Sequence, residues 1–332
     1  MRQECHALVA ESVYIALLEE VFVTDTATKP TVIVVSSHVA SGAVGNRAAV
    51  FALERLGFCV VAVPTVVLSW HPGEGPATRI TPPDDAFADL IGDLTRADWL
   101  GSVGGILSGY LGRAGQAAPI ATLVDAVKAR NPKALYLCDP VTGDAAGAYV
   151  PPDVIEAVRT RLLPRADVAT PNRHELSLMF GDAVAKDNQA LVAMARRTGI
   201  AEVLITSAFA GPGQVANLLV TSGEVYSARH DAEVDAPHGT GDLMAALYLG
   251  RRLSGASASE ALGSAVGSTR GLIERAAGAT RLPLAEAQDV LVELAALCHV
   301  AQYFQHLAQC HSVAVRPILH QRLEDICDGE NT

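Results

Sequence analysis

The chain has 332 residues, half of them hydrophobic, which is enough apolar material to bury the core of one large domain. Its formal net charge of −11 argues against nucleic acid as a partner, because Lys and Arg supply most non-specific affinity for phosphate backbones. The apolar N-terminal stretch carries Glu11, Glu19 and Glu20, which fits neither a secretory signal nor a membrane span. With six cysteines and no C-x-x-C pair, we expect a cytoplasmic protein with reduced thiols.

Short apolar runs alternate with segments of helical periodicity along most of the chain. The expected strands are residues 31–37, 59–65, 104–111, 134–140, 167–171 and 202–207. The expected helices are residues 45–57, 82–94, 119–132, 151–164, 188–199, 240–253, 257–276 and 284–297. Most of the strands are apolar on both faces, as in a sheet that helices cover on both sides. The sequence therefore predicts an α/β fold with a central, mostly parallel sheet.

Polar residues close the predicted strands. In open parallel sheets, ligands bind beyond the carboxyl ends of the strands, so these residues should meet at one edge. They are Ser37, Thr65, Ser108, Tyr110, Asp139, Asn172, Thr206 and Ser207. This edge is where we expect the functional site.

The stretch HGTGD, residues 238–242, opens the predicted helix 240–253. A helix start presents unpaired backbone N–H groups and a positive dipole end, and glycines let a phosphate approach the backbone closely. An anion should therefore lie over Gly239, Thr240 and Gly241. Asp242 could then accept a proton from a substrate hydroxyl during phosphoryl transfer. The local alternative is that Asp242 only caps the helix, and these residues alone leave both readings open.

Glu175, together with Asn172, and Asp139 could also serve either a catalytic or a purely local structural role. Asn172 and Glu175 are three residues apart, so on a helix they share a face and could both point at one hydrated cation. A capping box uses the same residue types at the same spacing. Asp139 follows an apolar strand and could meet a metal, or could form an Asp-Pro turn with Pro140.

The nucleotide-binding fingerprints are absent from the sequence. The segment SSHVASGAVGN, residues 36–46, contains two glycines but lacks the G-x-G-x-x-G spacing. No G-x-x-x-x-G-K-[ST] sequence occurs anywhere in the chain. A nucleotide, if bound, is not held by a P-loop.

Seven segments in this order resemble the vitamin-B6 kinase branch of the ribokinase superfamily, to which the pyridoxal kinases belong. They are SSHVASGAVGNRAAVFALERLG, LSGYLG, CDPVTGD, YVPPDVIE, ADVATPNRHEL, LITS and HGTGDLMAALYL. The resemblance covers about residues 31–297 and implies a ribokinase-like three-layer α/β/α kinase domain. Residues 1–30 and 298–332 lie outside it and are expected to be extensions, the second one helical or disordered.

The resemblance implies ATP-dependent phosphorylation of the 5′-hydroxyl of pyridoxal, and of pyridoxine and pyridoxamine as further candidates. It makes Asp242 the general base and Gly239, Thr240 and Gly241 the anion hole. The implied ATP-side residues are Asp139, Tyr149, Asn172, Thr206, Ser207 and His238, and Asp139 and Glu175 would organise Mg²⁺, with K⁺ as an optional second cation. The implied substrate-side residues are Ser37, Thr65, Tyr110 and His71, the last of these in a flap at residues 68–83. A homodimer is also implied.

Three other functions stay open at this point. The closest keeps the fold and reaction but takes hydroxymethylpyrimidine, a thiamine precursor, as substrate. Another is a non-catalytic B6-binding protein on the same scaffold, and a third is a sugar kinase of the wider superfamily. The C-terminal extension also holds several His and Cys residues, whose irregular spacing makes a zinc site the weaker interpretation.

Overall fold

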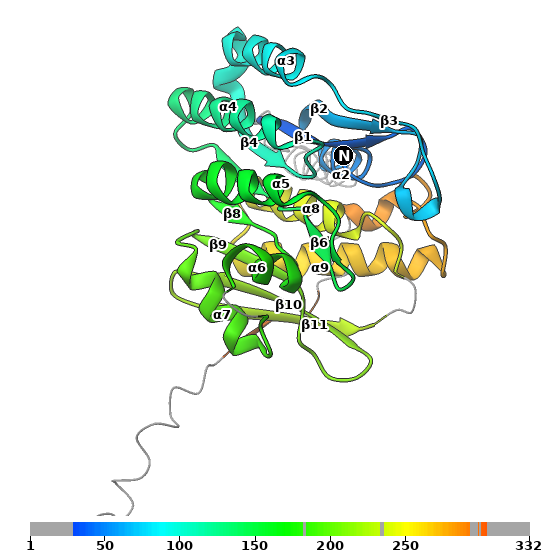
Figure 1. The fold of residues 1–332 in the computed structure, drawn as a ribbon. Helices are drawn as coiled ribbons and strands as arrows, with labels where there is room; N and C mark the ends of the chain where they lie inside the picture. The colour runs from blue at the N-terminus through cyan, green and yellow to red at the C-terminus, as the bar shows by residue number, and fades with distance from the viewer. Residues whose placement is uncertain (1–28, 182–183, 233–235, 293–297, 299, 304–332) are drawn as a thin grey trace, which may run out of the picture.

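A computed structural model describes residues 29–181, 184–232, 236–292, 298 and 300–303. Within these residues a sheet of ten strands crosses the molecule in the order β12-β11-β10-β9-β8-β5-β4-β1-β2-β3 (Figure 1). The strands are β1 (Thr31–Val39), β2 (Cys59–Leu68), β3 (Arg79–Ile80), β4 (Val103–Ser108), β5 (Leu135–Cys138), β8 (Val168–Ala169), β9 (Glu202–Ala208), β10 (Gln214–Thr221), β11 (Val225–Asp231) and β12 (Val300–Gln302). The neighbours from β2 through β9 are parallel, which confirms the predicted sheet.

Helices cover both faces of this sheet (Figure 1). One layer holds α2 (Asn46–Arg55), α8 (Thr240–Leu253) and α9 (Ala258–Ala276). The other holds α3 (Asp84–Arg96), α4 (Ala117–Arg130), α5 (Pro152–Ala157), α6 (Arg173–Phe180) and α7 (Asn188–Arg197). Strand β1 shows the consequence, since Val32 and Val34 join the first core and Ile33 and Val35 the second. The three-layer α/β/α prediction is confirmed.

The predicted helix 284–297 is wrong over its described part. Residues 284–287 form turns, a short 3-10 helix follows at Gln288–Leu291, and residues 293–297 lie outside the described residues. Leu282 and Leu284 are both buried in the core with α2, α8 and α9. Ala287, Val290 and Leu291 join the same core, so these turns and the short 3-10 helix bury the apolar side chains of the segment without a regular α-helix.

The sequence reading also missed the hairpin of β10 and β11, which are antiparallel. Its signal was present, because two runs with valine and leucine flank the turn residues Ser222 and Gly223. Strand β12 pairs with β11 and places Val300 to Gln302, part of the predicted C-terminal extension, at the edge of the main sheet. The remaining division of the chain stays a prediction, and residues 1–28 and 304–332 lie outside the description.

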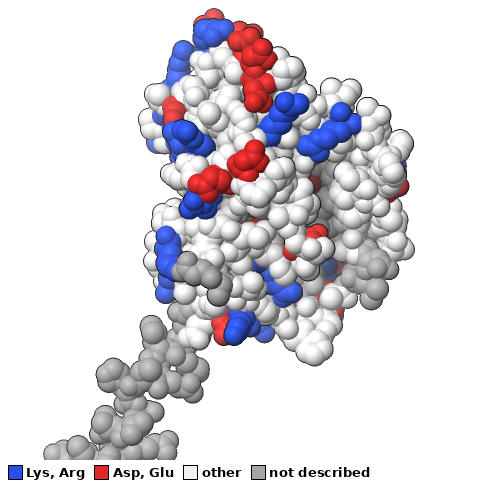
Figure 2. Space-filling view, viewed as in Figure 1, with Lys and Arg blue, Asp and Glu red and all other residues white. Residues whose placement is uncertain are grey.

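No helix among the described residues is long and apolar enough to cross a membrane. On the face drawn in Figure 2, blue and red side chains are interspersed and the basic ones form no continuous stripe among the described residues. This distribution agrees with the net negative charge of the chain and gives a polyanion no extended surface on that face.

Candidate active site

A cavity of about 720 Å³ lies where the parallel strands end. Its wall includes most of the residues predicted from the sequence: Ser37, His71, Tyr110, Asp139, Tyr149, Asn172, Glu175, Thr206, His238, Gly239, Thr240, Gly241 and Asp242. The predicted residues Thr65 and Ser207 are not part of this wall. Segments from both halves of the chain therefore converge on one site, as the strand-end rule predicts.

Asp242 lies in the first turn of α8 but does not cap the helix. The N-cap is Gly239, in a left-handed conformation with φ of 93°, and no side chain accepts a capping hydrogen bond there. Asp242 lies three positions after the N-cap and is part of the cavity wall. The simple capping interpretation of Asp242 is therefore wrong.

Burial changes the acidity of Asp242. Protein surrounds this half-buried carboxyl, and the resulting loss of hydration raises the pKa of Asp242 to about 6, although hydrogen bonds from the backbone of Gly45 and of Asp242 itself oppose the shift. At neutral pH the group is mostly ionised. It can thus accept a proton in the range where a general base works best.

Two glycines allow close backbone approaches around the loop after β1: Gly239 brings the start of α8 against this loop, and Gly45 brings the loop against β1. A Cβ atom at Gly239 would lie 1.9 Å from the Ala43 carbonyl oxygen, and one at Gly45 would lie 2.2 Å from the Ser37 carbonyl oxygen. Both positions also have positive φ, so only glycine fits. These contacts place the helix start directly beside the segment that carries Ser37.

Asp139 directly follows β5 and is buried. Its backbone N–H donates to the Ser108 carbonyl at 2.8 Å, and its carboxyl accepts the Thr170 hydroxyl at 2.8 Å. Burial, together with the charge of Asp242, raises the pKa of Asp139 to about 8. The two acids thus face the same small volume.

Asn172 and Glu175 form the capping box that the sequence left open. Asn172 Oδ1 accepts the N–H groups of His174 and Glu175, and Glu175 Oε2 accepts the Asn172 N–H at 2.9 Å. Glu175 Oε1 also accepts the Thr142 N–H at 2.9 Å. Burial, with the charge of Asp139, raises the pKa of Glu175 above its usual range. Both carboxylate oxygens of Glu175 are therefore held in place by backbone N–H groups at the cavity wall.

Thr206 and Ser207 are adjacent in β9, but only Thr206 lies in the cavity wall. Thr206 lines the cavity, and its N–H donates to the Pro171 carbonyl at 3.0 Å. Ser207 is exposed, with φ of 51°, at an irregularity in the pairing of β9 with β10. A non-glycine residue rarely adopts this conformation, and here it turns the chain so that only Thr206 lies in the wall.

Thr65 and Tyr110 belong to the substrate side but differ in position. Tyr110 lines the cavity, whereas Thr65 is fully buried and donates from its hydroxyl to the Tyr110 carbonyl at 2.7 Å. Thr65 therefore supports Tyr110 from behind. Arg79 in β3, which the sequence reading missed, lines the cavity and donates to the Tyr110 hydroxyl at 3.0 Å. Only its position in the predicted flap could have indicated it.

The charges of the cavity favour a cation. Asp139, Asp144, Glu175 and Asp242 line it, whereas Arg79 is the one Lys or Arg in the described wall. A polyphosphate entering this cavity needs positive charge between itself and the acids. Among the described residues no three His, Cys, Asp or Glu side chains form a complete metal site. This donor set fits Mg²⁺, which usually combines one or two carboxylates with substrate phosphates and water.

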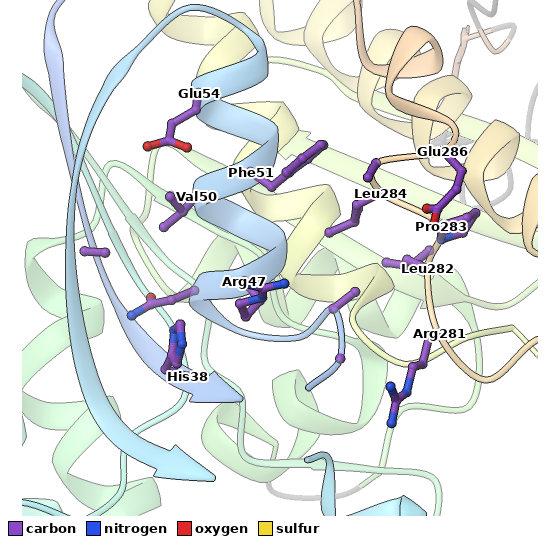
Figure 3. A pocket seen from close by; sticks show the side chains of 15 residues that line it. His38, Arg47, Val50, Phe51, Glu54, Arg281, Leu282, Pro283, Leu284 and Glu286 are labelled. Carbon is purple, nitrogen blue, oxygen red and sulfur yellow. The ribbon is translucent and has the colours of Figure 1, made fainter. Parts of the chain in front are cut away.

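A second cavity of about 620 Å³ lies between α2 and the segment 281–286 (Figure 3). Phe51 from α2 and Leu284 from the segment give it apolar side chains, and Arg47 and Glu286 also line it (Figure 3). It contains none of the predicted catalytic residues. The cavity at the strand ends is therefore the candidate active site.

Comparison with known proteins places the chain in a family. The profile described as phosphomethylpyrimidine kinase matches residues 107–283. The pyridoxal kinase PdxY of Deinococcus radiodurans is 38% identical over 240 residues, which cover 69% of this chain and 80% of that protein. The pyridoxal kinase PdxY of Rubrobacter xylanophilus is 36% identical over 267 residues, covering 78% of this chain and 92% of that protein.

The chain belongs to the pyridoxal kinase family. The solved pyridoxal kinase from Leishmania donovani, in complex with ADP and pyridoxamine, is similar with a TM-score of 0.78 and 28% identity, covering 83% of this chain and 100% of that one. The predictions of the family, the fold and a kinase of vitamin B6 are thereby confirmed. The roles assigned to single residues stay predictions.

Proposed function

We propose that this member of the pyridoxal kinase family transfers the γ-phosphoryl group of ATP to the 5′-hydroxyl of pyridoxal, with Asp242 as general base. The observation that carries the proposal is the cavity-facing carboxyl of Asp242, whose pKa is raised by burial to about 6. It accepts the hydroxyl proton as the oxygen forms a bond to the γ-phosphorus and the bond to ADP breaks. Backbone N–H groups over Gly239 to Gly241 stabilise the charge on the transferred group.

A divalent cation, which we take to be Mg²⁺, would be held by Asp139 and, through water, by Glu175. When bound, it supplies positive charge that neutralises the phosphates. The acidic wall supports this assignment, because ATP alone would be repelled by it. K⁺ is proposed from the resemblance alone.

The remaining roles follow the two sides of the cavity. Ser37 in β1, Tyr110 after β4 and His71 in the flap line the side where we place the pyridine ring. The residues that we place on the ATP side are Asn172, Thr206, Tyr149 and His238. Thr65 and Ser207 are assigned indirect roles, behind Tyr110 and beside Thr206. A homodimer and a cytoplasmic location are carried as expectations of the family resemblance and the composition.

The second candidate is a kinase of hydroxymethylpyrimidine, which the name of the matching profile favours. That match begins at residue 107, so it includes Asp139, Glu175 and Asp242 but not Ser37 or His71. The match therefore covers the proposed phosphoryl-transfer residues, but of the proposed ring-side residues it includes only Tyr110. A relative from Bordetella avium, 38% identical over 238 residues, is named a pyridoxine/pyridoxal/pyridoxamine kinase, which supports the B6 substrates.

The test is an assay of ADP release with pyridoxal, pyridoxine, pyridoxamine and hydroxymethylpyrimidine in parallel. We expect turnover with the B6 compounds and a loss of about 10²-fold or more in Asp242→Asn. Faster turnover of hydroxymethylpyrimidine would transfer the proposal to the second candidate. Undiminished activity of Asp242→Asn would remove the base assignment. If no compound releases ADP while pyridoxal still binds, the chain is a binding protein.

A further inference from the structure

The part of the predicted flap that links β2 to β3, residues 69–78, contacts the rest of the molecule away from the reacting groups. This part is called the flap from here on. Glu74 in the flap forms an ion pair with Arg281, which donates from Nη2 at 2.5 Å and from Nε at 3.2 Å. Arg281 Nη1 also donates to Ser41 Oγ at 2.8 Å, in the loop after β1. Figure 3 shows the Arg281 side chain turned away from Phe51 and Leu284, out of the apolar part of the second cavity.

A second contact joins the flap to the anion-binding loop. The rings of His71 and His238 are stacked, with centroids 3.9 Å apart. His71 Nδ1 accepts the Gly73 N–H at 3.1 Å, which fixes the ring at the start of the flap turn. His238 directly precedes Gly239, the N-cap of α8. The backbone N–H of His238 donates to the carbonyl of Thr280, the residue before Arg281, at 3.2 Å.

The Arg281 guanidinium therefore joins its own segment to the flap and to the loop after β1, and the backbone of Thr280, next to Arg281, joins that segment to the loop before α8. Neither Glu74 nor Arg281 lines the active cavity. Their pair nevertheless holds the flap against the backbone that forms the anion hole. Opening the flap requires that both the ion pair and the ring stack separate.

We propose that Glu74 and Arg281 are positioning residues that lock the flap onto the anion-binding loop, so that substrate enclosure and the phosphate site form together. The role in the reaction rests on the proposed function. A closed flap keeps water from competing with the substrate hydroxyl for the phosphoryl group. Breaking the pair therefore raises the KM for pyridoxal and the amount of ADP released per phosphorylated product.

The pair can be broken without unfolding the protein. The Arg281 and Glu74 side chains are 46% and 21% exposed, and ion pairs of this kind add little to global stability. They do bias an equilibrium between open and closed flaps, because they exist in one state only. The expected effect of Glu74→Gln or Arg281→Gln is a rise in KM of about two- to fivefold, with unfolding unchanged.

A fluorescence measurement reads the flap directly. The chain has two tryptophans: Trp70 is in the flap, and Trp99 is in the 3-10 helix Asp98–Ser102. In a Trp99→Phe background, Glu74→Gln and Arg281→Gln should each increase acrylamide quenching of Trp70. The charge-swapped protein Glu74→Arg/Arg281→Glu should regain part of the protection. Asp125→Asn, which breaks the comparable Asp125–Arg165 pair outside both cavities, should change nothing.

The kinetic measurement uses the same variants with pyridoxal and ATP. The lock is supported if the single variants raise the KM for pyridoxal and the ADP released per product, and if the charge swap reduces both increases. Two results would overturn the lock. One is unchanged quenching of Trp70 in both single variants, and the other is quenching in the charge-swapped protein that is as strong as in either single variant. If the wild type phosphorylates none of the B6 compounds, the proposed function fails while the quenching result still decides whether the lock exists.

Discussion

Asp139, just after β5, and Asp242, in the first turn of α8, line one cavity, and the charge of Asp242 helps to raise the pKa of Asp139. Burial and the neighbouring Asp242 charge together raise the pKa of Asp139 to about 8. Burial raises the pKa of Asp242 to about 6. Two carboxyls in this state favour the uptake of either protons or a cation.

The first prediction concerns stability. Because the pKa of Asp139 is higher in the folded than in the unfolded state, the folded protein binds more protons between about pH 4 and 8. The free energy of unfolding should therefore fall as pH rises through that window. Asp139→Asn should raise it at pH 8 by about 1–3 kcal/mol while lowering activity. Urea denaturation measures this, and the exposed control Asp89→Asn should leave it unchanged. A destabilised Asp139→Asn would contradict the prediction.

The second prediction concerns the pH dependence of kcat/KM for pyridoxal. Asp242 must be ionised to accept a proton, so kcat/KM should rise about tenfold per pH unit below 6 and level off above it. Initial rates from pH 4.5 to 8 test this, with Mg²⁺ varied because a bound cation stabilises the ionised form and lowers the midpoint. A flat profile would remove Asp242 as the titrating group.

Much of the fold follows from patterns within single segments. The valines and isoleucine of β1 predict a strand buried on both faces, and the structure divides them between two cores. The segment 284–297 was misread because its apolar spacing suggested a helix, whereas its described part packs into the core with α2, α8 and α9 as turns and a short 3-10 helix. Local periodicity carries no information on such long-range packing.

The candidate site was likewise predictable in part from the sequence. The types and order of Asp139, Glu175 and Asp242 predicted a common edge, and the structure brings them together. The sequence could not show that Thr65 is covered by the Tyr110 backbone, or that Ser207 turns away at an irregular strand end. These outcomes depend on contacts between segments far apart in the chain.

The third prediction tests the close approach of the start of α8 to the loop after β1. Gly239→Ala would place Cβ 1.9 Å from the Ala43 carbonyl oxygen, so it should cost about 3 kcal/mol or more and lower kcat. Gly255→Ala is the matched control, since Gly255 has nearly the same φ, 92° against 93°, but nothing near its Cβ position. It should cost only about 1 kcal/mol. Equal losses in thermal denaturation would show that the approach to Ala43 is unimportant.

The fourth prediction concerns the polar contacts that hold α8, the helix that carries Asp242, on the sheet. The Tyr248 hydroxyl donates to Glu202 at 2.6 Å, and Arg252 Nη2 donates to the same carboxylate at 2.7 Å. Because Glu202 and Arg252 are mostly buried, Glu202→Gln should lower the free energy of unfolding by about 1–3 kcal/mol, and Tyr248→Phe by about 1 kcal/mol.

The double variant Glu202→Gln/Tyr248→Phe distinguishes a network from separate contacts. If Tyr248 and Arg252 share the Glu202 carboxylate, the two changes should cost less together than the sum of the single changes. The control Asp125→Asn removes a more exposed pair with Arg165 and should cost less than about 1 kcal/mol. Since α8 carries Asp242, Glu202→Gln should also reduce kcat more than KM. Strictly additive losses with unchanged kcat would show that Glu202 stabilises the fold without positioning the catalytic helix.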